Sequence, residues 1–494
     1  MAHEYAQYHK QLLDEYRGNP LIEALPDIWT EDEVIRKLTR VAPHNDSERG
    51  YAPELRYHCI ARLSQGYYQP LEQHIDIEVR ISRCLRQGYL SRNPLAPAYA
   101  RTLAEGFEAQ TDRRMMTPVV TYSPRISGFT ILGVSGIGKS TAVESVLQLY
   151  PQVIMHSEYN GKSFQQAQIV WLKLDCPYNG NVRGLCFNFM KAVDDATGTG
   201  YFNEYHRSRV STDSLMVLMQ RIAATYCLGI LVIDEIQHLD MAGSKSDEML
   251  NFFVTLVNTI GVPVVMIGTP LAMRILQSEF RQARRGSGQG DLLWPVMGKD
   301  AIWDVFIESM WPYQWTRHTV PLTPEMNQAL YDESQGVTVI AVILYEIVQL
   351  EAISSQKETF TPGDIGAAAR KRLNFVQPMI RALRSGDNAT IEKFGDIAMS
   401  LIDTYGTPEL PQPPKKASAS RPKLADLITA HLQELGVEPE KARVYAEEAS
   451  KGKDDLAAPS DVLKTAYGLY LRSQAGAPAI EADDEDLRNK IQAQ

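Results

Sequence analysis

Short apolar runs alternate with longer amphipathic stretches between residues of about 125 and 300. A strand that is buried on both faces reads as a continuous apolar run, and a helix that covers it has one apolar face. This alternation therefore predicts an α/β fold with a parallel sheet flanked by helices. The runs that we expect to form strands are 128–134, 168–175, 229–236 and 261–268.

The segments before and after this alternating pattern have the sequence features of helices or of a linker. Helical periodicity, broken by Gly and Pro, runs through the first part of the chain and returns after residue 320, where we expect a small helical lid. A stretch rich in Pro, Ser and Lys follows and cannot bury a core. We expect a helical N-terminal region (1–120), the α/β core (121–320), the lid (321–400), a linker (401–423) and a short helical tail (424–494).

Composition narrows the class of protein. A chain of 494 residues is long enough for roughly three domains. Its 50 Lys and Arg against 60 Asp and Glu give a net charge of −10, which excludes a generally polybasic nucleic-acid coat, so DNA binding would need a local basic stripe. The five cysteines form no C-x-x-C pair, and no apolar run is long enough to span a membrane. We expect a cytoplasmic protein without a disulfide framework or a structural metal.

One motif follows the first expected strand directly. Residues 133–140, Gly-Val-Ser-Gly-Ile-Gly-Lys-Ser, match the pattern G-x-x-x-x-G-K-[ST] and open onto an amphipathic helix. Backbone N–H groups of such a loop wrap the β-phosphate of a nucleotide, Lys139 neutralises the β- and γ-phosphates, and the Ser140 hydroxyl ligates magnesium. The sequence therefore predicts ATP and Mg²⁺ as ligands, held by Gly133, Ser135, Gly136, Ile137, Gly138, Lys139, Ser140 and Thr141.

Two further expected strands end in polar residues. The run 230–233 is followed by Asp234 and Glu235, and parallel strands deliver such residues to the sheet edge where ligands bind. We expect Asp234 to hold the magnesium, mostly through water, and Glu235 to act as the general base that polarises the attacking water. Thr269 follows the next strand and is placed to bond this water or the γ-phosphate, the alternative being a simple Thr-Pro turn.

An arginine cluster lies downstream of Thr269. Arg281, Arg284 and Arg285 fall within about one helical turn. In ring or filament ATPases an arginine of this kind reaches the γ-phosphate bound by the next subunit and stabilises the transition state. The same cluster fits a solvated helix end or a contact with DNA phosphates, so these alternatives stay open.

Together, the phosphate loop, the Asp-Glu strand, the arginine cluster and the helical lid resemble an AAA+ ATPase. Within that superfamily the chain is similar to the transposition regulators called TnsC, with their relatives TniB and MuB. One departure is the start of the lid stretch, Gly336-Val337-Thr338-Val339, which lacks the arginine that many AAA+ lids contribute. The narrower resemblance is carried by LRQGYLSRNP (85–94), GVSGIGKST (133–141), VWLKLDCPYNG (170–180), LVIDEIQHL (231–239), VVMIGTP (264–270) and the lid stretch 334–353.

The resemblance implies an ATPase that forms rings or filaments on duplex DNA and links target-site selection to the transposase. A target selector of the TniQ or TnsD type would load it through the N-terminal region, and in CRISPR-associated elements an RNA-guided complex would act upstream of that selector. The transposase TnsB, with the endonuclease TnsA as a further candidate partner, would dock on the tail.

Contacts with duplex DNA are expected from cationic and small hydroxyl side chains that bind phosphates without reading bases. Each candidate also fits an ordinary surface role. The candidates are Arg183, Thr197, Thr199, Arg207 and Arg209.

Two other functions fit the same motifs. A replication initiator or helicase loader of the AAA+ type shares every nucleotide motif, although the tail after residue 423 supplies no evident winged-helix domain. A nucleotide-gated DNA scaffold would assemble on ATP binding with negligible hydrolysis. Glu235→Gln separates this scaffold from a switch that is timed by hydrolysis.

Overall fold

The computed structural model describes residues 4–97, 99, 128–207, 210–238, 262–272, 289–386 and 437–451, together with single tail positions between 425 and 469. The chain forms two compact units, Met1–Pro408 and Glu409–Gln494. None of the helices among these residues is long and apolar enough to cross a membrane.

The centre of the first unit is a five-stranded sheet in the order β5-β6-β7-β2-β8, and every neighbouring pair is parallel. The apolar runs predicted the four strands in the middle and on one side of this sheet. They did not predict β8, which is short, half exposed and polar at its start. The strands are β2 (Phe129–Gly133), β5 (Trp171–Asp175), β6 (Ile230–Asp234), β7 (Val264–Gly268) and β8 (Asp291–Trp294).

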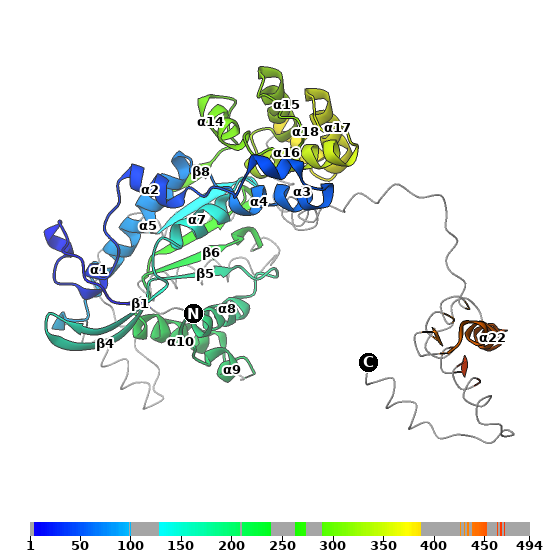
Figure 1. Ribbon diagram of the computed structural model, residues 1–494. Helices are drawn as coiled ribbons and strands as arrows, with labels where there is room; N and C mark the ends of the chain where they lie inside the picture. The colour runs from blue at the N-terminus through cyan, green and yellow to red at the C-terminus, as the bar shows by residue number, and fades with distance from the viewer. Residues whose placement is uncertain are drawn as a thin grey trace. The chain divides into compact units, whose positions relative to one another are not determined.

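Helices cover both faces of this sheet (Figure 1). Alternate side chains of β6 point to opposite faces: Leu231 and Ile233 pack with one helix layer, and Ile230 and Val232 with the other. The first layer holds α8 (Val182–Thr197) and α10 (Thr212–Thr225), and the second holds α5 (Glu72–Leu90) and α7 (Lys139–Leu147). The short helix α9 (Tyr201–Tyr205) packs on α8. This three-layer arrangement confirms the predicted fold class.

A second, three-stranded sheet lies in the same unit. Its strands are β1 (Glu4–Tyr5), β3 (Val153–Tyr159) and β4 (Lys162–Ile169), in the order β1-β3-β4. A two-residue turn joins β3 to β4, and its residues Asn160 and Gly161 have φ angles of 50° and 75°. Asn-Gly is the pair that favours such a hairpin turn. The sequence thus carries a local signal for this hairpin, although the expected strand 168–175 covers only the last two residues of β4 before it continues into β5.

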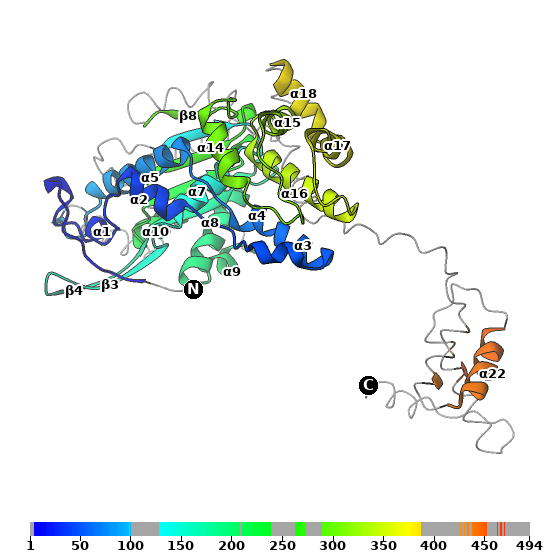
Figure 2. The same cartoon turned by 45° about the horizontal axis from the view of Figure 1, so that its top comes forward.

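The lid is helical, as expected (Figure 2). Its apolar core includes Trp303, Leu344 and Ile380 and is shared with Ile60 and Leu63 of the N-terminal region. The buried face of α14 (Ala301–Met310) packs in this core, so α14 belongs to the lid although it lies before the expected lid range of 321–400. The helices are α14 (Ala301–Met310), α15 (Pro324–Ser334), α16 (Thr338–Ser354), α17 (Pro362–Arg372) and α18 (Gln377–Ser385).

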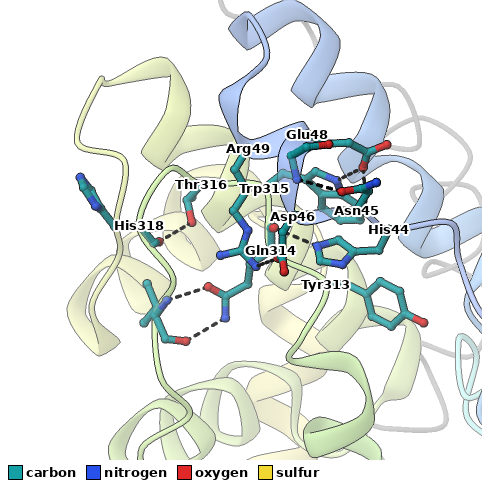
Figure 3. A network of polar contacts seen from close by, with 12 residues as sticks. His44, Asn45, Asp46, Glu48, Arg49, Tyr313, Gln314, Trp315, Thr316 and His318 are labelled. Carbon is teal, nitrogen blue, oxygen red and sulfur yellow. Dashed lines mark hydrogen bonds and ion pairs between the residues drawn. The ribbon is translucent and has the colours of Figure 1, made fainter.

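The N-terminal region contacts both the sheet layers and the lid. Helices α1 (Pro20–Glu23) and α2 (Glu31–Leu38) pack on α5, whereas α3 (Pro53–Ile60) and α4 (Arg62–Gly66) pack on α16 of the lid. Figure 3 shows the polar part of this second contact: His44 Nε2 lies 3.2 Å from the Gln314 carbonyl oxygen, and Trp315 Nε1 donates to Glu48 at 2.8 Å.

In the second unit, helix α22 (Pro439–Ser450) buries Ala442, Ala446 and Ala449, which are spaced three or four residues apart and so lie on one helix face. They pack with Leu432, Val437 and Val462 in a small apolar core.

Candidate nucleotide-binding site

The predicted phosphate loop joins β2 to α7. Gly136 and Gly138 have φ angles of 78° and 99°, in the left-handed region that favours glycine. Gly133 is required for a different reason, since a Cβ there would lie 2.6 Å from the Trp294 carbonyl oxygen of the neighbouring strand β8. The glycines of the motif therefore allow both the turn of the loop and its close approach to the sheet.

Lys139 is the first residue of α7, and only 8% of it is exposed. Its ammonium donates to the carbonyl oxygens of Gly133 and Val134, at 2.8 and 2.9 Å. Burial lowers the pKa of Lys139 to about 8, against the opposing effect of the Glu235 and Asp234 carboxylates. The cation is thus held within the loop and faces the two carboxylates at the end of β6.

The other residues predicted to hold the nucleotide line the same loop. Ser135 and Ile137 are buried, Ser140 is half-buried and Thr141 is exposed. The Thr338 hydroxyl, at the start of lid helix α16, donates to the Ile137 carbonyl oxygen at 3.3 Å. The lid therefore touches the phosphate loop at the position where the sequence lacks the expected arginine.

Asp234 ends β6 and is 3% exposed. Its Oδ1 accepts a hydrogen bond from the Glu235 backbone N–H at 2.9 Å, and its Oδ2 lies 3.0 Å from the Lys173 ammonium. Lys173 also pairs with Glu144 at 3.0 Å and with Asp175 at 3.2 Å. Burial alone would lower the pKa of Lys173, but Asp234, Asp175 and Glu144 outweigh it and raise this pKa.

These side chains fit a magnesium ion. The Asp234 carboxylate and the Ser140 hydroxyl offer hard oxygen ligands, which are the type that Mg²⁺ prefers. Asp234 is fixed at the end of a buried strand, and Ser140 lies in the first turn of α7. Lys173 is not among the predicted site residues, and its only signal in the sequence is a single cation within the apolar strand β5.

Glu235 has a φ of 56°, a left-handed conformation that is uncommon for a residue other than glycine. Burial, followed by the charge of Asp234, raises the pKa of the Glu235 carboxyl. The Gln237 side-chain amide donates a hydrogen bond to this carboxylate. Glu235 is therefore partly withdrawn from water and held by a specific neighbour.

Thr269 directly follows β7, the strand next to β6, so it lies at the same sheet edge as Asp234. It is 3% exposed, and its backbone N–H donates to the Gln237 side-chain oxygen at 3.1 Å. Its hydroxyl is buried without a hydrogen-bond partner among the described residues. The structure thus brings Lys139, Asp234, Glu235 and Thr269 to one edge of the sheet.

Several predicted residues lie outside this edge. Arg281, Arg284, Arg285 and Arg209 lie outside the described residues. Arg183 donates to the Val210 carbonyl oxygen and lies over the Phe187 ring at 5.0 Å.

The remaining DNA candidates lie around the end of α8. The Thr197 hydroxyl donates to the Val193 carbonyl oxygen, and the Thr199 hydroxyl donates to Asp194, each at 2.8 Å. Arg207 is exposed. The two threonines thus take part in hydrogen bonds within the protein, and DNA contact by Arg183, Thr197, Thr199 and Arg207 stays a prediction.

Comparison with known proteins identifies one domain. Residues 127–276 match the family model described as an AAA domain. No curated protein matches the chain.

Several solved structures are similar to the chain. The Orc1 protein of Aeropyrum pernix, in complex with DNA, is 14% identical with a TM-score of 0.36, and the match covers 76% of this chain and 86% of that one. The Drosophila ORC bound to DNA is 13% identical with a TM-score of 0.32, and the match covers 82% of this chain and 87% of that one. Cdc6p from Pyrobaculum aerophilum is 12% identical with a TM-score of 0.34, and the match covers 76% of this chain and 86% of that one. At this level of similarity, function has to be argued from the site. Residues 127–276 are similar to an AAA domain, and the parallel sheet with its phosphate loop has the AAA+ P-loop fold.

Proposed function

We propose that the protein binds ATP with Mg²⁺ at the edge of the five-stranded sheet, hydrolyses it, and uses this cycle to control its assembly on duplex DNA. The observation that carries the proposal is the convergence of the Lys139 loop, the Asp234-Glu235 pair and the buried Thr269 hydroxyl at one sheet edge. A cation, a metal carboxylate, a base and a polar group beside them are the parts that phosphoryl transfer to water needs.

Each residue has a distinct role in this proposal. The loop N–H groups and Lys139 bind the phosphates, Ser140 and Asp234 hold the metal, and Glu235 takes the proton of the attacking water. The bound metal supplies charge that offsets the developing negative charge of the phosphates. Thr269 orients the water or the γ-phosphate. One of Arg281, Arg284 and Arg285 serves the site of the next subunit, and the candidate DNA residues track phosphates.

Binding and hydrolysis are tested separately with two variants. Lys139→Ala is expected to abolish ATP binding, measured with a fluorescent ATP analogue. Glu235→Gln is expected to keep binding but to lose hydrolysis by roughly 10²- to 10⁴-fold, the usual size of a general-base contribution. Phosphate release is measured with and without random duplex DNA. If Lys139→Ala binds ATP as tightly as wild type, the proposed site is refuted. If wild type and Glu235→Gln both hydrolyse ATP at a negligible rate, the nucleotide-gated scaffold is favoured.

Two finer functions use the same residues. One is a replication initiator or helicase loader, and the other is a transposition regulator that works with a TniQ- or TnsD-type selector, TnsB and TnsA, with or without a CRISPR complex. The initiator function fits at least as well as the transposition function, because none of the described site residues is specific to transposition. The transposition partners rest on the sequence resemblance alone.

Imaging and partner binding distinguish these functions. Single particles of the protein with random duplex DNA are imaged with and without a non-hydrolysable ATP analogue. Rings or filaments on DNA that require the analogue support ATP-driven assembly. Retention of purified transposase on these assemblies would favour the transposition regulator, and retention of a replicative helicase would favour the loader.

A further inference from the structure

Gln237 lies two residues after Glu235, in the turn that follows β6, and is 1% exposed. Its side-chain amide makes two hydrogen bonds, since Nε2 donates to Glu235 Oε2 and Oε1 accepts from the Thr269 backbone N–H at 3.1 Å. A flipped amide would place oxygen against the carboxylate and N–H against N–H. The two neighbours therefore fix which end of the amide faces which group.

The chain around Gln237 leaves little room for another arrangement. A Cβ at Gly268, the last residue of β7, would lie 2.6 Å from Ile236 Cγ1 and 3.2 Å from Gln237 Oε1. The end of β7 thus packs directly against the turn after β6. Glu235 itself has a φ of 56°, and a residue stays in such a conformation only where its surroundings hold it.

The Gln237 side chain connects Glu235 and Thr269, two site residues that lie far apart in the sequence. Glu235 follows the last residue of β6, Thr269 follows the last residue of β7, and Gln237 is hydrogen-bonded to both. A base must be held within a small tolerance of its water to be effective. A buried amide with two fixed partners restricts the carboxylate in this way, whereas a solvated Glu235 would sample several rotamers.

We propose that Gln237 is a positioning residue that holds the Glu235 carboxylate in its working orientation and ties that orientation to the end of β7 at Thr269. This inference rests on the proposed ATPase function. When the γ-phosphate shifts Thr269, Gln237 moves with it and shifts the Glu235 carboxylate. The rate of hydrolysis therefore depends on whether Thr269 contacts the γ-phosphate.

Two variants of Gln237 and one matched control test this role. Gln237→Met removes both hydrogen bonds at similar volume, and Gln237→Glu keeps an acceptor for Thr269 but replaces the donor to Glu235 by a second carboxylate. The control is Gln349→Met in the lid. Gln349 is also fully buried, accepts from the Trp315 backbone N–H at 2.9 Å and donates to the Tyr313 carbonyl oxygen at 3.1 Å.

The full-length protein is assayed with Mg²⁺-ATP and duplex DNA for kcat, KM and the Kd of a fluorescent ATP analogue. Both Gln237 variants are expected to lose kcat by about tenfold to a hundredfold, with the Kd within about twofold of wild type, because a small misplacement costs this much in rate. Gln349→Met is expected to keep the wild-type kcat, although it loses the same kind of buried amide.

The outcomes separate this inference from the proposed function. A wild-type protein that binds the analogue but does not hydrolyse ATP refutes the ATPase proposal and this inference with it. If the wild-type protein hydrolyses ATP and Gln237→Met has the same kcat, the positioning role alone is refuted. Equal losses of kcat in Gln237→Met and Gln349→Met would also refute it, since the loss would then be structural.

Discussion

Lys173 shows how charge is balanced at the scale of single residues. Its ammonium lies 3.0 to 3.2 Å from the carboxylates of Asp234, Glu144 and Asp175. Asp234 is almost fully buried, and an ionised carboxylate in such a place needs a cation beside it. A strand residue that is remote in sequence from Asp234 thus supplies the charge that a metal ion can also supply.

Lys173→Met is therefore expected to make stability depend on magnesium. Removing one partner of a buried ion pair costs about 3–5 kcal/mol, and Mg²⁺ bound at Asp234 would recover part of this loss. Urea unfolding of wild type and variant, in EDTA and in Mg²⁺, measures the effect. A variant that gains no more stability from Mg²⁺ than wild type does would contradict this role.

At the scale of elements, α3 is anchored to the lid by a buried ion pair. Arg56, which is fully buried, donates from Nη1 and Nη2 to the two carboxylate oxygens of Glu358, each at 2.7 Å. The hydrogen bonds from Arg56 lower the pKa of Glu358. Arg56 also donates to the Trp315 carbonyl oxygen at 3.0 Å.

Arg56→Met is expected to lower the free energy of unfolding by at most about 3–5 kcal/mol, because it removes the closer of the two cations that pair with Glu358 and leaves only Arg317, at 3.5 Å. The double variant Arg56→Met with Glu358→Met is expected to lose less than the sum of the two single variants. Denaturant unfolding of the four proteins measures this coupling, and additive losses would contradict it.

The contact between α4 and α16 is expected to respond to pH. Glu346 on α16 accepts a hydrogen bond from the Ser64 backbone N–H at 2.8 Å, and burial raises the pKa of Glu346 to about 7. An acid whose pKa is raised on folding keeps its proton in the folded state after the unfolded chain has lost it. Stability is therefore lost as pH rises from about 4.5, the ordinary value of glutamate, to about 7.

Glu346→Gln removes this titration and keeps an oxygen that accepts from Ser64. We expect the variant to be more stable than wild type at pH 8, by at most about 3 kcal/mol, and to show a flatter dependence between pH 5 and pH 7. Urea unfolding at these pH values measures it. Parallel pH curves for the two proteins would show that Glu346 is not the responsible group.

At the scale of the whole molecule, the three large apolar cores lie within the first unit, and the tail has a separate small core. The N-terminal helices contribute to the first unit on both sides, through α5 on the sheet and α3 and α4 on the lid. These helices are therefore part of the framework that holds the AAA domain and the lid.

A chain shortened to residues 1–408 is accordingly expected to unfold at the same temperature as the first unit of the full chain and to bind the fluorescent ATP analogue with the same Kd. Calorimetry and a binding titration check this. A shortened chain that is unfolded, or that binds the analogue more weakly, would show that the tail supports the first unit.

Features that depend on neighbouring residues could be predicted from the sequence. These are the buried strands, the phosphate loop and the polar residues at or directly after the ends of β6 and β7, because strand burial and loop geometry are encoded in local patterns. The contacts of Lys173, Gln237 and Thr338, the pairing of β8 and the attachment of α3 to the lid emerged only from the folded chain. Each of these depends on a contact between segments that fold against one another, and a single sequence does not show which side chains meet across such contacts.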